Sequence, residues 1–351
     1  MQVMAYGGSR GAPFHQAICE STALEAGSTS NITSDTWVQV TNLSGCNSSD
    51  PQSESALACM RSIPFERLLA TTIAQHDSTS TQNDGDTYLP AVDGDFLPMA
   101  SSKLAKEGLF SPMPIIVGWT EDDATIFTHS TIKTSEETVA FINLYFPGLN
   151  STSVSKLLSL YPISDFAGNP SANLSAEFYR SAQITRDIIF SCPSFYFGYA
   201  MSKKAENVYF YSHNQTIFDP FLASVGLPGL GVIHTSELPY VFGNLSVYDT
   251  GPTYQPTPAD FELLRQMSRS WSSFASVGAP SLEDHETLKG WTPAYAQGDA
   301  EFDARIYVVG GPGEGMSALE GSEAKKAVVR QKLAQRCAFL NSDDVINQLR
   351  Y

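Results

Sequence analysis

The sequence predicts an α/β protein built on a mostly parallel sheet. Three short apolar runs, rich in β-branched and aromatic residues, have the length and the flanking turn residues of buried strands: 113–118, 207–212 and 304–309. Continuous apolar runs of this kind are typical of strands that are covered on both faces. Segments with helical periodicity lie between and after them, and this alternation of strands and helices defines the α/β class.

The amino-terminal third of the chain adds one strand and several polar segments. Residues 14–19 have the pattern of a further strand. The Ser-, Thr-, Asn- and Asp-rich stretch 27–55 and the polar run 76–86 are interpreted as exposed excursions from the body of the protein. The segment between Cys46 and Cys59 is typical of a turn that leads into a helix.

Two helices in the second half of the chain have recognisable ends. Thr257 can cap a helix whose first turn contains Pro258 and whose end is marked by Gly278. A last helix is expected to begin near Ser322 and to turn Cys337 toward the core. In the first of these helices, apolar residues recur at helical spacing and predict a buried face made of Phe261, Leu264, Trp271 and Phe274.

The composition is that of an ordinary globular protein. With 351 residues, of which 42% are hydrophobic and 17% charged, the chain can bury a sizeable core, and we expect a single domain over residues 1–351. The formal net charge of −16 disfavours nucleic acid and anionic lipid surfaces as partners. No segment approaches the roughly 20 consecutive apolar residues of a membrane-spanning helix, so no integral membrane segment is expected. The sequence does not indicate an oligomeric state.

Asparagine usage indicates the secretory route. More Asn residues than expected by chance begin an N-x-Ser/Thr motif, which is the acceptor of N-glycosylation. The first residues nevertheless lack the basic and apolar regions of a signal peptide, so we expect the signal to lie in a missing amino-terminal part. The seven acceptor residues are Asn31, Asn42, Asn47, Asn150, Asn173, Asn214 and Asn244.

The sequence indicates neither a metal nor a cofactor. Its six histidines and five cysteines lack the spacings of metal-ligand motifs. The Gly-rich segment 311–315 lacks the Lys and Ser/Thr of a phosphate-binding loop and is interpreted as a turn. Among the cysteines, only Cys46 and Cys59 are close enough in sequence to suggest a small disulfide loop, and the other pairings stay open at this point.

Candidate catalytic groups follow the predicted strands. Glu121, Asp122 and Asp123 come directly after the strand 113–118, where active-site acids of open α/β sheets lie. They can equally cap the next helix. His234 follows a Gly- and Pro-containing loop, and histidine is the most frequent general base, although most single histidines in loops are not catalytic.

A serine nucleophile is harder to find. Ser9 lies in Gly7-Gly-Ser-Arg-Gly11, which matches the G-x-S-x-G pattern of a nucleophile elbow. That motif requires a preceding strand and a following helix. Here Pro13 interrupts any helix after the motif, so we interpret the segment as a surface turn.

The order of several motifs is similar to that of type-B carboxylesterases, a family that includes cholinesterases and some secreted fungal lipases. The resemblance covers essentially the whole chain and corresponds to the region that follows the nucleophile in that family. No single motif is specific, but their order and spacing together are. The segments that carry the resemblance are Tyr6–Gly8, Ala17–Ser21, Cys46–Cys59, Asp93–Pro98, Gly118–Phe127, His234–Gly243, Trp271–Pro280 with Trp291, and Gln335–Leu340.

The resemblance implies an α/β-hydrolase fold and a carboxylic-ester hydrolase of the serine esterase or lipase type. His234 would be the general base and Asp123 the acid that orients it, with Asp122 as the alternative acid. The family more often has Glu at the acid position. The implied substrate is a small-molecule or lipid ester, and its acyl and alcohol groups are not determined by the sequence.

The resemblance also implies an absence from these residues. In the family, the nucleophile elbow and the oxyanion loop lie upstream of the position of Met1, so we expect the chain alone to be inactive and to lack the amino-terminal strands of the sheet. The alternative is a non-catalytic hydrolase-fold protein used for binding or adhesion. By analogy with the family, Cys46 would pair with Cys59 and Cys192 with Cys337, which leaves Cys19 outside these two bridges.

Overall fold

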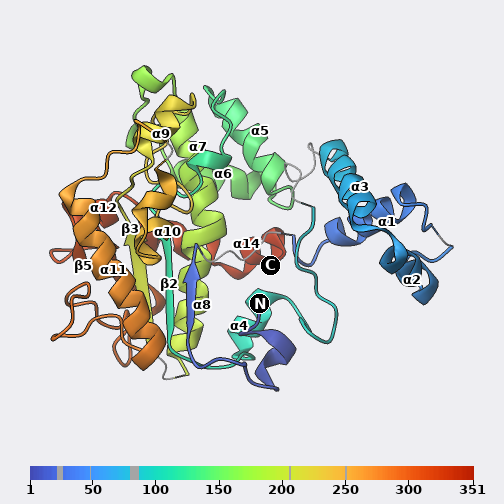
Figure 1. The fold of residues 1–351 in the computed structure, drawn as a ribbon, viewed down its shortest axis with the longest axis horizontal. Coiled ribbons are helices and arrows are strands. Elements are labelled where there is room, and N and C mark those ends of the chain that lie inside the picture. Colours follow the sequence, from blue (N-terminus) through green and yellow to red (C-terminus); the bar gives the residue numbers. More distant parts are fainter. Residues whose placement is uncertain (22–26, 48, 80–86, 205–206, 250) are drawn as a thin grey trace.

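Five strands form one sheet in the computed structural model, which describes residues 1–351 except 22–26, 48, 80–86, 205–206 and 250 (Figure 1). The strands lie side by side in the order β1-β2-β3-β4-β5; the first four are parallel, and β5 is antiparallel to β4. Their bounds are β1 Ala17–Glu20, β2 Ile115–Thr120, β3 Val208–His213, β4 Arg305–Val309 and β5 Gly315–Ala318. The four strands predicted from the sequence are therefore confirmed, with ends that differ by at most three residues.

Helices cover both faces of this sheet. The α-helices are α1 Ile32–Leu43, α2 Glu54–Ser62, α3 Phe65–Ser78, α4 Ser101–Glu107, α5 Ser135–Tyr145, α6 Ser151–Leu160, α7 Ala176–Arg186, α8 Cys192–Ser202, α9 Asp219–Ser224, α10 Leu238–Val241, α11 Pro258–Val277, α12 Lys326–Val329, α13 Leu333–Leu340 and α14 Asp343–Leu349. Short 3-10 turns are η1 Ala5–Gly8, η3 Thr125–Phe127, η4 Ile163–Asp165, η5 Pro170–Ala172, η7 Leu245–Tyr248 and η8 Glu301–Asp303. A π-helical turn, η6 Asp187–Ser191, joins α7 to α8.

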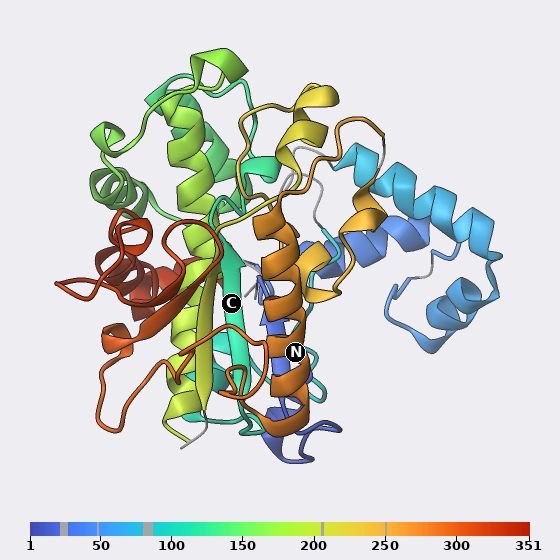
Figure 2. The ribbon, with the colours of Figure 1, turned by 60° about the vertical axis from the view of Figure 1, so that its left-hand side comes forward.

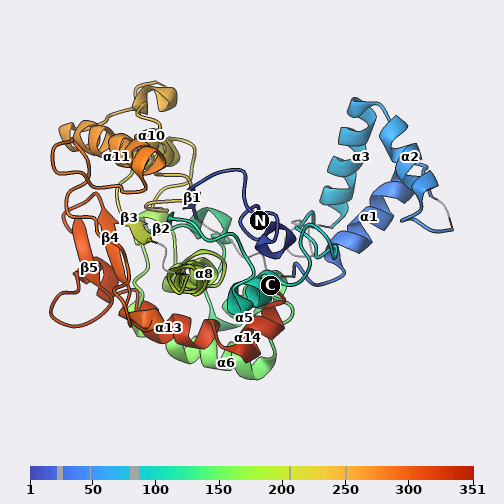
Figure 3. The ribbon, with the colours of Figure 1, turned by 90° about the horizontal axis from the view of Figure 1, so that it is seen from below.

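The sheet has two buried faces because successive side chains of a strand point in opposite directions. In β2, Val117 and Trp119 join the apolar cluster beneath α8, whereas Ile116 joins the cluster beneath α11. Figure 3 shows α8 and α11 on opposite sides of the strands, and Figure 2 shows α11 lying along the sheet. Gly118 is required in β2, because a Cβ there would lie 2.2 Å from the ring of Tyr211.

The structure contains two disulfides: one joins helices that are far apart in sequence, and the other closes a short loop. Cys192 of α8 pairs with Cys337 of α13, and Cys46 pairs with Cys59. Both pairings implied by the family resemblance are confirmed. Cys19 forms no disulfide.

The two helices predicted in the second half differ in outcome. α11 has the expected ends, since Thr257 caps it and Gly278 ends it in the left-handed conformation with φ 74°. Trp271 and Phe274 are buried as predicted, but Phe261 is exposed. The expected last helix is instead two helices, α12 and α13, which are separated at Lys332 with φ 49°, a conformation outside the helical region.

Helices α1, α2 and α3 project from the body of the protein in both views (Figures 1 and 2). The stretch 27–55 was expected to be an exposed excursion, and it does leave the body, but it contains the regular helix α1. A small apolar cluster of Val40, Cys46 and Met60 holds this projection together.

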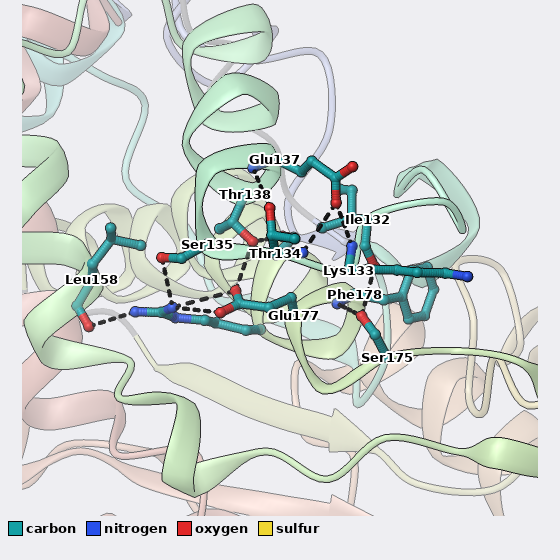
Figure 4. A network of polar contacts seen from close by, with 12 residues as sticks. Ile132, Lys133, Thr134, Ser135, Glu137, Thr138, Leu158, Ser175, Glu177 and Phe178 are labelled. Atoms are coloured by element: carbon teal, nitrogen blue, oxygen red, sulfur yellow. Dashed lines mark hydrogen bonds and ion pairs between the residues drawn. The ribbon is translucent and has the colours of Figure 1, made fainter.

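A buried polar network joins helices α5 and α7 (Figure 4). Glu177 accepts hydrogen bonds from Thr138 Oγ1 at 2.7 Å and from Arg180 Nη1 at 3.1 Å, and Arg180 Nη2 donates to the carbonyl oxygen of Leu158 at 2.9 Å. The ion pair is almost fully buried. Because each charged group has a partner, the network fixes α5, α6 and α7 relative to each other.

Candidate active site

The sequence-predicted acid and base, Asp123 and His234, lie together at the carboxyl end of the sheet. Asp123 follows β2 after a short turn and is 0% exposed. His234 lies in the loop between α9 and α10, and its Nδ1 is 2.6 Å from Oδ1 of Asp123. A carboxylate can only accept, so Nδ1 donates the proton and Nε2 is left as a proton acceptor.

The second oxygen of Asp123 is held by two donors. Ser21 Oγ donates to Asp123 Oδ2 at 2.7 Å, and the backbone N–H of Thr120 donates at 3.0 Å. Ser21 follows β1 directly and has φ 51°, which turns the chain sharply at the end of the strand. These bonds leave Asp123 one orientation, with Oδ1 toward the histidine. The sequence did not predict a role for Ser21, because only strand pairing brings it beside Asp123.

Asp122 lies next to the acid and has a different set of contacts. Its Oδ2 accepts from the N–H of Val232 at 2.9 Å, and its own N–H donates to the Val232 carbonyl at 3.1 Å. Gly231 permits this approach, because it has φ 72° and a Cβ there would lie 2.2 Å from the Asp122 carboxylate. Asp122 therefore holds the loop that carries His234, and burial raises the pKa of Asp122 to about 6.

Aromatic rings lie on both sides of the His234 imidazole. Phe190 of η6 stacks on it with ring centroids 5.4 Å apart and planes 18° apart, and Phe127 lies at 5.3 Å with planes 59° apart. The His234 side chain is 32% exposed. Burial lowers the pKa of His234, but the hydrogen bond and the charge of Asp123 outweigh it, so the pKa is raised above its ordinary value.

Glu237 is a further buried carboxyl group whose electrostatics are coupled to those of Asp123 and His234. Glu237 is 1% exposed, and its Oε1 accepts from the Tyr211 hydroxyl at 3.3 Å. Within the described residues its Oε2 has no hydrogen-bond partner. Burial, and secondarily the negative charge of Asp123, raise the pKa of Glu237 to about 8. Glu237 is therefore mostly protonated at neutral pH. Glu237 lies within the segment His234–Gly243 that carries the family resemblance, but the sequence did not predict a role for it.

Ser9 is not brought to this site. It lies in the turn after η1, where its Oγ donates to the carbonyl oxygen of Tyr6 at 2.7 Å. The neighbouring Gly8 packs against Phe110, which precedes the amino end of β2. Because the six residues of β2 span about 20 Å, Ser9 and His234 are at opposite ends of the sheet.

Two further observations concern the described part of the chain. No group of three or more His, Cys, Asp or Glu side chains there could hold a metal ion. Among the same residues no helix has the length and apolar character needed to cross a membrane.

The chain belongs to the carboxylesterase family, whose model matches residues 2–305. It is 42% identical to a secreted lipase of Arthroderma benhamiae over 352 aligned residues, which cover 100% of this chain and 61% of the lipase. It is 31% identical to the inactive carboxylesterase-like protein VdtD of Byssochlamys spectabilis, with 94% and 58% of the two chains covered.

The fold agrees with that of solved esterase structures. The structure of Aspergillus niger EstA superposes with a TM-score of 0.73 at 19% identity, over 100% of this chain and 62% of EstA. A PNB esterase superposes with a TM-score of 0.68 at 22% identity. The protein therefore has an α/β-hydrolase-like fold, and its chain spans less than two thirds of the length of these relatives.

Proposed function

We propose that this chain supplies the acid and the base of a serine-type carboxylic-ester hydrolase. His234 acts as general base and Asp123 orients it. The observation that supports this most is the 2.6 Å contact between His234 Nδ1 and the buried Asp123 carboxylate. Asp123 makes this contact, whereas Asp122 bonds the loop backbone, and for that reason we propose Asp123 rather than Asp122 as the acid.

In this proposal the chemistry follows the pattern of acyl transfer through a serine. His234 Nε2 takes the proton of a serine hydroxyl as its oxygen attacks the ester carbonyl, and Asp123 stabilises the imidazolium that forms. Backbone N–H groups hold the tetrahedral oxyanion. His234 then gives the proton to the leaving alcohol, and a water molecule repeats the sequence on the acyl-enzyme to release the acid.

We further propose that the serine and the oxyanion loop come from residues outside these 351, together with strands that extend the sheet beyond β1. Two observations support this. β1 pairs on one side with β2, and within the described residues no strand pairs with its other side. The relatives are longer than this chain, which covers 61% of the fungal lipase. The chain alone would then be inactive.

We propose that the protein is secreted and glycosylated. Relatives from three fungi are named secreted lipases. Six of the seven acceptor asparagines are exposed, and Asn214 is half-buried. The proposed substrate is a small-molecule or lipid ester.

The test uses a fluorophosphonate, which forms a covalent bond with an activated serine. We expect labelling of one serine in the protein extended by its upstream reading frame, and none in the 351-residue chain. His234→Ala should abolish the labelling, while His285→Ala, which changes an exposed histidine, should leave it intact. If the extended protein is not labelled, the enzymatic proposal is wrong.

A non-catalytic function is the alternative, and one observation favours considering it. A relative that covers 94% of this chain is named an inactive carboxylesterase-like protein. Labelling of the extended protein that depends on His234 would exclude this alternative.

A further inference from the structure

The helical segment that packs against His234 is interrupted by the π-helical turn η6. α7 ends at Arg186 and α8 begins at Cys192, and the five residues between them have hydrogen bonds that span five residues instead of four. Such a turn inserts one residue, which rotates the side chains by about 100° relative to a regular helix. π-helical turns within α-helices are found frequently at functional sites.

Buried polar contacts hold this turn in place. Asp187 accepts from Arg186 Nη2 at 2.6 Å and from the Tyr161 hydroxyl at 2.8 Å. Ser194 Oγ donates to the carbonyl oxygen of Phe190 at 2.7 Å. These buried hydrogen bonds hold the backbone around Phe190.

Phe190 meets the imidazole face to face. Its ring plane is 18° from that of His234, and Phe190 is only 6% exposed. Phe127 contacts the same imidazole at a steep angle and is 41% exposed. Phe190 thus presents a buried ring that is nearly parallel to the imidazole, whereas Phe127 presents a tilted and partly exposed ring.

The histidine needs such a surface. One hydrogen bond, from Nδ1 to Asp123, does not by itself fix the side-chain torsions of His234, and a tilt of the imidazole moves Nε2. We propose that Phe190 is a positioning residue, whose ring holds the His234 imidazole in the plane that keeps Nδ1 on Asp123 and Nε2 directed at the nucleophile. The direction of Nε2 toward a nucleophile rests on the proposed function; the stacking itself does not.

NMR of the 351-residue chain with labelled histidine rings tests this. His234→Ala identifies the resonances of His234. In the wild-type protein, the ring current of Phe190 should shift the carbon-bound ring protons of His234 upfield, and Nδ1–H should give a low-field resonance that is protected from exchange. Phe190→Leu keeps an apolar side chain but removes the flat ring, and we expect it to speed exchange of Nδ1–H about 3- to 10-fold.

Matched variants separate positioning from general packing. Phe190→Tyr keeps the flat ring and should restore slow exchange. Phe127→Leu removes the tilted ring and should change the rate less than about 2-fold, because a tilted and exposed contact restricts rotation less. A merely structural role would make both Phe190 variants similar to each other.

Three results would overturn the inference: no upfield shift in the wild-type protein, an unchanged exchange rate in Phe190→Leu, or equal effects of Phe190→Leu and Phe190→Tyr. If Phe190→Leu does not fold, the wild-type shifts and Phe190→Tyr still decide. None of these measurements needs ester hydrolysis, so a failure here is distinct from a failure of the fluorophosphonate test.

Discussion

Replacing Glu237 by Gln should make the protein more stable at alkaline pH and change it little at acid pH. Glu237 is 1% exposed, and one of its carboxyl oxygens has no hydrogen-bond partner within the described residues. The charged or titratable groups that interact with Glu237 are Asp123, Glu20, His234 and Tyr211. Two of these groups are carboxyls, so ionisation of Glu237 adds a negative charge beside Asp123 and Glu20.

The magnitude follows from the pKa of Glu237, which is about 8 in the folded protein against an ordinary value of 4.5. A raised pKa contributes stability that is fully present below pH 4.5 and is lost as the pH rises to about 8. The difference between these two pKa values corresponds to about 5 kcal/mol in total, and about 4 kcal/mol of it falls between pH 5 and pH 9. Gln cannot ionise, so the variant lacks this loss.

Urea denaturation at pH 5, 7 and 9 measures the effect. The unfolding free energy of the variant minus that of the wild type should increase by about 4 kcal/mol from pH 5 to pH 9, which is about 1.3 M in urea midpoint for a slope near 3 kcal/mol/M. Glu262→Gln, at an exposed position, serves as the control and should show no such trend. An equal pH dependence in wild type and Glu237→Gln would refute the assignment of a buried, protonated Glu237.

Three further changes have definite expected outcomes. Ser21→Ala removes one of the donors to Asp123 Oδ2 and should lower the unfolding free energy by about 1–3 kcal/mol at pH 7; an unchanged urea midpoint would contradict the contact. Burial lowers the pKa of His213 to about 3, so the stability contributed by this neutral histidine is present above pH 6.5 and is lost as the pH falls toward 3. The unfolding free energy of His213→Gln minus that of the wild type should therefore increase by about 3 kcal/mol as the pH falls from 7 to 4. Urea denaturation at both pH values measures this difference. Cys337→Ser opens the loop of 145 residues that the bond to Cys192 closes and should cost about 5 kcal/mol, measured against wild type under non-reducing conditions; equal stability would show that the bridge does not constrain the unfolded chain.

Elements with strong local signals could be predicted from the sequence. Strands such as β2 and β3 were predicted because continuous apolar runs of this length are stable only when buried in a sheet. The ends of α11 were predicted because Thr257 and Gly278 act on the backbone within a few residues. Asp123 and His234 were recognised as candidates from the motifs that surround them.

How these candidates meet depends on contacts between distant parts of the chain. Asp122 and Asp123 are adjacent residues of the same type. Only the path of the loop near Val232 places the loop backbone against Asp122 and His234 against Asp123. Ser21 and Phe190 reach the site through strand pairing and a π-helical turn, which leave no periodic pattern in the sequence. Contacts between residues about 100 positions apart depend on packing, whereas caps and apolar runs act locally, and this is why sequence reasoning found the acid and the base but not the groups that hold them.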